Sequence, residues 1–162
     1  IVITTIFIVY VLKMEPDLFK MIVPFSEGKE IDIKWAAIPL AYIAVIGTVN
    51  GVNFTDGLDG LATGVTTMVA VFYTIISMVS NGGISPITSA VTGALLGFLL
   101  FNVHPAQVFM GDTGSLALGG FVAGAAYMMK MPLFIPIIGL IYFVEVISVI
   151  LQVTYFKKTG GK

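Results

Sequence analysis

Two stretches of this chain contain no charged side chain. The first lies between Lys34 and Asp56, and the second lies between Asp59 and Asp112. About 20 apolar residues are enough to cross a bilayer as a helix, so each stretch has room for at least one crossing. Within hydrocarbon the backbone must satisfy its own hydrogen bonds, which makes helices the expected structure. The charge pattern therefore predicts an all-α polytopic membrane protein.

The composition supports the same class and excludes others. Of the 162 residues, 57% are hydrophobic and 10% are charged, whereas a soluble domain carries about 25% charged residues. The net charge is -1 and no clustered basic surface is present, so we expect no nucleic-acid partner. The chain has no cysteine, which excludes disulfides and thiolate metal sites. The lipid bilayer is the expected surroundings of most of the chain.

Polar and helix-breaking residues divide the apolar sequence into about five complete transmembrane helices and one partial helix. We expect the complete spans at 36–53, 61–79, 87–101, 115–129 and 133–156, and the partial one at 1–12. Gly93 with Gly97, and Gly120 with Gly124, have the small-xxx-small spacing that suits close helix packing. The chain opens inside an apolar run and ends at Gly160-Gly161-Lys162. We therefore expect residues 1–162 to form a single transmembrane domain that is incomplete at both ends.

Counting spans assigns the polar segments to two faces of the membrane. Two spans separate the loop at 53–60 from the loop at 102–114, so both should lie on one face. The segment 13–34 should lie on the other, and its alternating residues 30–34 predict a small hairpin. The lysines are more numerous on the side of segment 13–34, so the positive-inside rule alone favours the opposite orientation to the one expected below from the substrates.

Polar residues recur at every third position where the first complete span ends. They are Asn50, Asn53, Asp56 and Asp59. Neighbours at this spacing lie close on a helix, and Gly57 and Gly60 allow a bend from which both aspartates could be aimed at one point. The simpler interpretation is a solvated loop with helix-capping side chains. In a chain so poor in charge, ionisable residues beside the membrane favour a functional site.

A second polar group precedes the fourth complete span. It comprises Asn102, His104, Pro105, Phe109, Gly111, Asp112, Thr113, Gly114 and Ser115. A helix start rich in small residues can bind an anion, and Asp112 beside it would repel a phosphate unless a cation lay between them. Carboxylates without cysteine suit Mg²⁺ or Mn²⁺ rather than zinc. An ordinary helix cap remains the alternative for Asp112, and His104 is interpreted as a structural histidine of the loop.

Three stretches resemble the polyprenyl-phosphate N-acetylhexosamine-1-phosphate transferases. They are NGVNFTDGLDGLA at 50–62, FNVHPAQVFMGDTGSLALGG at 101–120 and SVILQV at 148–153. The resemblance implies a ten-helix fold, of which this chain would be a fragment with a small extracytoplasmic hairpin at 13–34. It implies cytoplasmic active-site loops at 53–60 and 102–114 in a bacterial inner membrane.

The resemblance also implies a reaction. Within the family the likeness is to members that transfer phospho-MurNAc-pentapeptide from UDP to undecaprenyl phosphate, giving lipid I and UMP in peptidoglycan synthesis. Mg²⁺ is the implied cofactor, and UDP-MurNAc-pentapeptide, undecaprenyl phosphate and a second copy in a homodimer are the implied partners. Because two loops of the family's active site fall outside this sequence, we expect the fragment alone to be inactive.

Site residues are carried over from the same resemblance. Asp56, Asp59 and Asp112 are implied as catalytic, with Asp112 as the Mg²⁺ ligand and Asp56 close to the metal. The implied substrate-binding residues are Asn53, Gly57, Leu58, Asp59, Asn102, Phe109, Gly111, Ser115 and Gln152. Phe109 would stack on uracil, although an aromatic residue in an interfacial loop needs no ligand.

Two other functions stay open. A relative that transfers GlcNAc-1-phosphate to undecaprenyl phosphate, as in teichoic-acid or O-antigen initiation, would share most of these residues. A cation transporter could use the three aspartates as an ion site at mid-membrane, but their expected places at the ends of spans argue against it. Glu145, inside the last span, is interpreted as a hydrogen-bonding group rather than a catalytic one.

Overall fold

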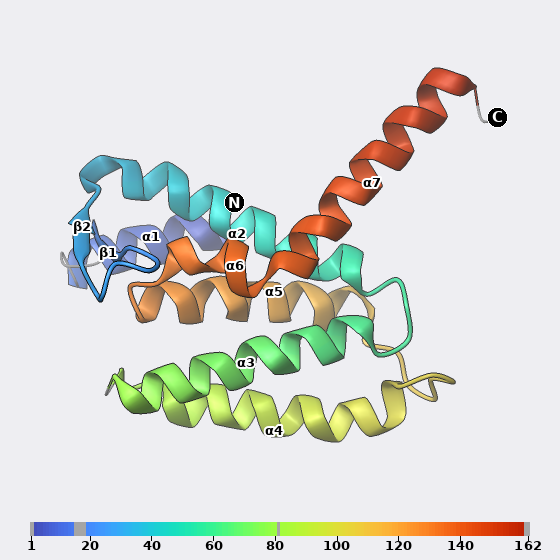
Figure 1. The fold of residues 1–162 in the computed structure, drawn as a ribbon, viewed down its shortest axis with the longest axis horizontal. Coiled ribbons are helices and arrows are strands. Elements are labelled where there is room, and N and C mark those ends of the chain that lie inside the picture. The colour runs from blue at the N-terminus through green and yellow to red at the C-terminus, as the bar shows by residue number, and fades with distance from the viewer. Residues whose placement is uncertain (1, 15–18, 81, 161–162) are drawn as a thin grey trace.

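The computed structural model describes residues 2–14, 19–80 and 82–160, with side chains from 2–10 in the first of these ranges. The N-terminal elements are α1 (Val2–Met14), β1 (Lys20–Ile22), β2 (Glu30–Asp32), the 3₁₀ turn η2 (Lys34–Ala36) and α2 (Ala37–Thr55). They are followed by α3 (Leu61–Val79), α4 (Ser85–Asn102), α5 (Gly111–Met128), η3 (Pro132–Phe134), α6 (Ile135–Ile138) and α7 (Leu140–Thr159). The long helices run back and forth, and the short hairpin lies at one end of them (Figure 1).

Four helices are long and apolar enough to cross a membrane. They are Lys34–Thr55, Leu61–Val79, Ser85–Asn102 and Leu140–Thr159. Their length and composition confirm the predicted class, a multi-pass all-α membrane protein. The expected span at 115–129 also forms a long helix, α5, but falls outside this set.

The α5 helix is the centre of the bundle. It lies between α2 and α3 and contacts both (Figure 1). Its buried positions are mostly small, including Gly119, Ala123 and Ala126, and Val122 is fully buried among them. The face of α5 that packs on its neighbours is therefore built from small residues, which carry little apolar side-chain surface.

The glycines that permit close packing are not the ones predicted. A Cβ on Gly93, Gly97, Gly120 or Gly124 would meet no described atom within 4 Å. A Cβ on Gly119 would instead collide with Val49 Cα and lie 2.7 Å from the Thr48 carbonyl oxygen. The spacing rule found glycine-rich helix surfaces, but the rotation of α5 about its own axis presents Gly119 to α2.

The last expected span, 133–156, is not continuous. The turn η3 and the short helix α6 come first, and α7 begins only after Gly139. Pro136 lies in the first turn of α6, where its missing N–H costs nothing. At Gly139 a Cβ would lie 2.9 Å from Tyr142 Cδ2 and 3.0 Å from the Ile135 carbonyl oxygen. The prediction of one helix was therefore wrong, because a proline and a glycine together allow the chain to turn. Beyond this turn α7 projects away from the bundle (Figure 1).

The predicted hairpin forms within segment 13–34, of which residues 15–18 lie outside the described residues. Its strands are antiparallel, with Lys20 opposite Asp32 and Ile22 opposite Glu30. The Ile22 N–H donates to the Lys130 carbonyl oxygen at 2.8 Å, just beyond the end of α5. Since Asp112 lies at the start of α5, the hairpin and Asp112 are about 27 Å apart along an 18-residue helix.

Candidate active site

Two loops meet at the end of the bundle away from the hairpin. The first loop (56–60) joins α2 to α3, and the second loop (103–110) joins α4 to α5 (Figure 1). One carboxylate oxygen, Asp59 Oδ2, accepts from the Ala106 backbone N–H and contacts His104 Nδ1, both at 3.1 Å. We call these two contacts the Asp59 clamp. They agree with the span count, which put both loops on one face.

Glycine allows the loops to come this close. Gly60 has a positive φ of 75°, and a Cβ there would lie 3.3 Å from Val103 Cα. A larger residue at Gly60 would face both backbone strain and a crowded neighbour. From the sequence, Gly60 was expected only to allow a bend in the first loop. The structure shows that it also lets the backbone of the second loop approach closely.

A second junction joins the end of α2 to the start of α5. Asn53 Nδ2 donates to Asp112 Oδ1 at 3.1 Å and lies 2.9 Å from Ser115 Oγ. Ser115 is fully buried, and its hydroxyl also reaches the Gly111 carbonyl oxygen at 3.1 Å. Three of the predicted site residues are thus brought together, and Asn53 fixes one oxygen of the Asp112 carboxylate.

Asp56 lies at the C-terminal cap of α2, close enough to Asp112 for their charges to interact. Its backbone N–H donates to the Val52 and Asn53 carbonyl oxygens. Partial burial raises the pKa of the Asp56 carboxyl, and the negative charge of Asp112 raises it further. Two carboxylates that repel each other in this way are stabilised by a cation between them.

These residues fit the hard cation that the resemblance implies. Among the described residues no group of three or more His, Cys, Asp or Glu side chains could form a complete metal cage. Mg²⁺ does not need one, because it commonly takes one or two carboxylates together with water and substrate phosphates. Asp56 and Asp112 are of the required number and chemistry.

Asp59 differs from Asp56 in its surroundings. The hydrogen bond from the Ala106 N–H, followed by the one from His104, lowers the pKa of the Asp59 carboxyl below its ordinary value. One of its oxygens is therefore occupied by the second loop, and the other remains for a ligand.

Asn102 lies beneath the second loop. It is buried, its Oδ1 accepts from Thr63 Oγ1 at 2.6 Å, and its Nδ2 donates to the Val108 carbonyl oxygen at 2.9 Å. The resemblance implies that Asn102 lines the substrate site, and these contacts show that it also supports the second loop. Thr63, its partner on α3, was not singled out from the sequence, since a threonine in an apolar helix carries no distinctive signal.

The apolar residues of the two loops face outward. The side chain of Leu58 is 69% exposed, and that of Phe109 is 73% exposed. Gly57 leaves open space on the first loop, and Gly111 has a positive φ of 66° where α5 begins. Exposed Leu58 and Phe109 on adjoining loops are available to contact a flat apolar ligand.

Gln152 lies apart from this cluster. It is on α7, and its Nε2 donates to Ser148 Oγ on the same helix at 3.1 Å. Asn50, likewise, donates to the Ile46 carbonyl oxygen of its own helix at 2.7 Å. The three-residue spacing of Asn50, Asn53, Asp56 and Asp59 therefore does not aim all four side chains at one point.

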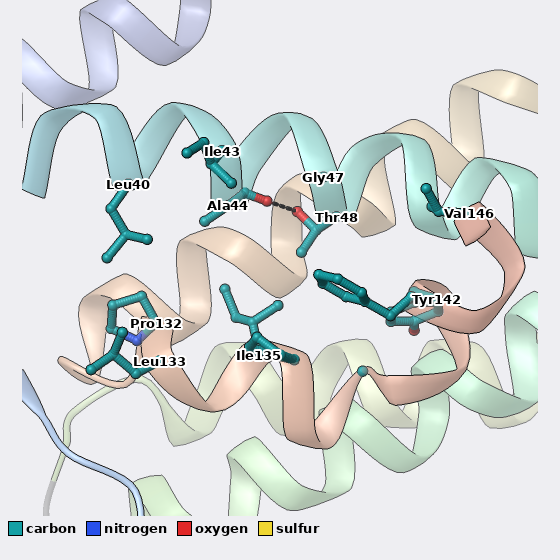
Figure 2. A pocket seen from close by; sticks show the side chains of 13 residues that line it. Leu40, Ile43, Ala44, Gly47, Thr48, Pro132, Leu133, Ile135, Tyr142 and Val146 are labelled. Atoms are coloured by element: carbon teal, nitrogen blue, oxygen red, sulfur yellow. Dashed lines mark hydrogen bonds between the residues drawn. The ribbon is translucent and has the colours of Figure 1, made fainter. Parts of the chain in front are cut away.

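An apolar pocket of about 210 Å³ lies between α2 and the segment from η3 to α7. The lining includes Thr48 on α2, Ile135 on α6 and Tyr142 on α7 (Figure 2). Tyr142 also hydrogen-bonds Thr66 at 2.7 Å, which fixes the base of α7 to α3. Thr48 at the edge of the pocket is five residues from Asn53, a rise of about 7.5 Å along α2.

Known proteins resemble this chain closely. Residues 1–130 match glycosyl transferase family 4. A phospho-N-acetylmuramoyl-pentapeptide-transferase of Caldanaerobacter subterraneus subsp. tengcongensis is 53% identical over 144 residues, which are 88% of this chain and 45% of that protein. Proteins of the same name from Caldicellulosiruptor bescii and Clostridium perfringens are 50% identical over 133 residues and 52% identical over 141 residues. These matches cover 82% and 86% of this chain, and 42% and 43% of the relatives. The chain thus spans less than half the length of these curated relatives.

Proposed function

This chain belongs to glycosyl transferase family 4, and from that premise we propose that the full-length protein transfers phospho-MurNAc-pentapeptide from UDP to undecaprenyl phosphate. One observation carries the proposal: Asn53 holds Asp112 beside Asp56 at one end of a bundle of membrane helices. That arrangement offers paired carboxylates where a soluble nucleotide and a lipid phosphate could meet. The names of the relatives favour this substrate.

The chemistry needs a site that reduces repulsion between anions. An oxygen of the lipid phosphate attacks the phosphorus attached to the sugar, and the bond between the two phosphates of UDP breaks. Lipid I forms and UMP leaves. A Mg²⁺ ion held by Asp56 and Asp112 would supply positive charge to the phosphates.

The protein's own groups position the reactants. Asn53 orients Asp112 through the 3.1 Å hydrogen bond. The first backbone N–H groups of α5, beyond Gly111, suit a phosphate oxygen. Phe109, exposed on the second loop, would stack on uracil. The protein therefore acts mainly by positioning and by electrostatics.

We assign the apolar pocket to the first isoprene units of the lipid carrier. Its lining residues are apolar except for the Thr48 and Tyr142 hydroxyls, and both of these are hydrogen-bonded elsewhere. The pocket and the Asn53 junction share α2, so a prenyl chain in the pocket could present its phosphate toward Asp112.

The loops would face the cytoplasm of a bacterial cell, because UDP-sugars are made there. This orientation predicts that a cysteine replacing Gln107 reacts with an impermeant reagent only from the cytoplasmic side. A cysteine replacing Glu27, exposed in the hairpin, should react only from the outside. Reaction of both from the same side would contradict the arrangement.

Release of UMP from UDP-MurNAc-pentapeptide, dependent on undecaprenyl phosphate, tests the function in the purified full-length protein. UDP-GlcNAc serves as the competing substrate, and preferential use of it would identify the GlcNAc-1-phosphate transferase instead. Ion flux in proteoliposomes without transfer would favour the transporter. The positions of Asp56, Asp59 and Asp112 at helix ends and in a loop weigh against a transporter site at mid-membrane.

A further inference from the structure

His104 is an exposed histidine with a specific polar contact. Its side chain is 84% exposed, so it does not serve to fill the core. Its Nδ1 lies 3.1 Å from Asp59 Oδ2, across 45 residues of sequence. The same Asp59 oxygen accepts the Ala106 N–H. One oxygen of the first loop therefore holds two positions of the second loop.

The contact defines which ring nitrogen carries the proton. A carboxylate oxygen can only accept a hydrogen bond, so His104 Nδ1 must be the donor. The Nε2 nitrogen is not used by this contact. A side chain that places an N–H at the Nδ1 position can therefore replace the histidine, whereas one that places it at the Nε2 position cannot.

The far end of the second loop is held separately. The Gln107 and Val108 N–H groups donate to the Phe101 carbonyl oxygen at 2.8 and 3.2 Å. Asn102 binds the Val108 carbonyl oxygen from below. Phe109 follows these contacts directly, so its backbone position depends on how the loop is closed, and the Asp59 clamp closes the part that these contacts do not reach.

We infer that His104 is a positioning residue of this site: through Asp59 it holds the second loop against the first, and so sets where Phe109 and Leu58 meet the uridine base. The inference deepens the proposed function and rests on it. His104 itself contacts neither the base nor the reacting phosphates in this role. Its loss should weaken binding of the uridine substrate and leave the chemical step and the lipid substrate unaffected.

The test uses the full-length protein with His104→Ala, His104→Asn and His104→Gln, and with Gln107→Ala as an exposed control on the same loop. The kcat and the KM for each substrate are measured with UDP-MurNAc-pentapeptide and undecaprenyl phosphate. His104→Ala should raise the KM for the UDP substrate about tenfold, as expected for a lost hydrogen bond to a charged group. The kcat should stay within about twofold, and the KM for undecaprenyl phosphate should not change.

The two amide variants distinguish positioning from a general loss of the ring. Asn places its N–H near the Nδ1 position and should restore the KM, whereas Gln mimics Nε2 and should behave like Ala. In the double variant with Asp59→Asn, the two effects on KM should be less than additive. A wild-type KM in His104→Ala, a fall confined to kcat, or rescue by Gln rather than Asn would overturn the inference.

Hydrogen exchange separates this inference from the proposed function. If the wild-type protein transfers nothing from UDP-MurNAc-pentapeptide, the proposed function fails, but the clamp can still be judged. The Ala106 amide should then exchange faster in His104→Ala than in wild type, and at the wild-type rate in His104→Asn. Unchanged exchange in His104→Ala would overturn the clamp itself.

Discussion

The candidate site has two ends that are held in different ways. At the helix-held end, formed by Asn53, Asp112 and Ser115, the side chains come from the packed helices α2 and α5. At the loop-held end, formed by Asp59, His104, Ala106 and Phe109, the contacts lie between two exposed loops. The first includes a fully buried hydroxyl, whereas the second ends in an aromatic ring that is 73% exposed.

The difference suggests a division of work. Groups that are proposed to hold a metal and phosphates gain from a rigid base, because small displacements are costly to electrostatic stabilisation. The proposed nucleotide substrate has to enter and leave, and exposed loops open more easily than packed helices. Damage to the helix-held end should therefore abolish turnover, while damage to the loop-held end should weaken binding by degrees.

The largest effect is expected from Asp112→Asn in the full-length protein. The substitution keeps the shape and the hydrogen bond from Asn53 but removes the charge proposed to hold Mg²⁺. Turnover should fall by about 10²-fold or more, with the protein still folded and extractable. A transferase assay across a Mg²⁺ titration measures this, and added Mg²⁺ should restore only part of the rate. Asp56→Asn should also be severe. Wild-type turnover with unchanged Mg²⁺ dependence would contradict the metal assignment.

Gly119→Ala should damage the helix-held end through packing alone. Its new Cβ would collide with the α2 backbone at Val49, and overpacking of this kind costs about 1–3 kcal/mol. Thermal unfolding of the purified protein measures the loss. Gly120→Ala is the matched control, because a Cβ there meets no described atom within 4 Å. Equal melting temperatures for the two variants would show that the α2–α5 contact is looser than described.

Phe109→Ala should show the graded response of the loop-held end. Loss of base stacking should weaken binding of the UDP substrate by about 1–3 kcal/mol. Calorimetric titration with UDP measures the change, and Val103→Ala, also exposed on the second loop, serves as the control. Unchanged affinity in a folded Phe109→Ala protein would leave this residue without a role in binding.

The smallest effect is a difference in titration between Asp56 and Asp59. The pKa of Asp56 is raised by burial and by Asp112, while that of Asp59 is lowered by the Ala106 and His104 hydrogen bonds. As the pH falls, Asp56 should take up a proton above the ordinary value of 3.8 and Asp59 only below it. Carboxyl ¹³C shifts of labelled aspartates, assigned with Asp→Asn variants, measure the order in the metal-free protein.

The signs of the linked stability changes are opposite. The raised pKa of Asp56 means that the folded state favours the protonated carboxyl. The stability that this proton contributes is lost as the pH rises through the folded pKa. The lowered pKa of Asp59 means that the clamp stabilises the loops above the ordinary value and is lost as the pH falls through the folded pKa. Titration of Asp59 before Asp56 would reverse the comparison between the two ends.

Much of the fold could be predicted because the membrane leaves few choices. Long charge-free stretches must form helices, and counting them put the first and second loops at one end. The hairpin followed from alternation and a turn. The break at Gly139 was missed because an apolar run looks continuous when only hydropathy is read.

The candidate site could be predicted as a set of residue types but not as a set of contacts. Asn53, Asp112 and Ser115 were named from motifs, and the structure joins them. His104 was interpreted as a structural histidine of the loop, and the resemblance implied that Asp59 is catalytic and substrate-binding. Their contact was not predicted, because 45 residues separate them in the sequence. Asn102 is implied by the resemblance to line the substrate site, and that role stays a prediction. Its hydrogen bonds to Thr63 and to the second loop could not be read from the sequence.

The sequence by itself determined the solvent of each segment, since the absence of charge allows burial in lipid and the polar motifs require an aqueous end. Tertiary structure alone decided which face of each helix meets a neighbour. Periodicity gives the spacing of residues along a helix, but the rotation of one helix against another depends on packing at every contact. For this reason Gly119 rather than Gly120 meets α2, and the Asp59 carboxylate accepts a hydrogen bond from His104.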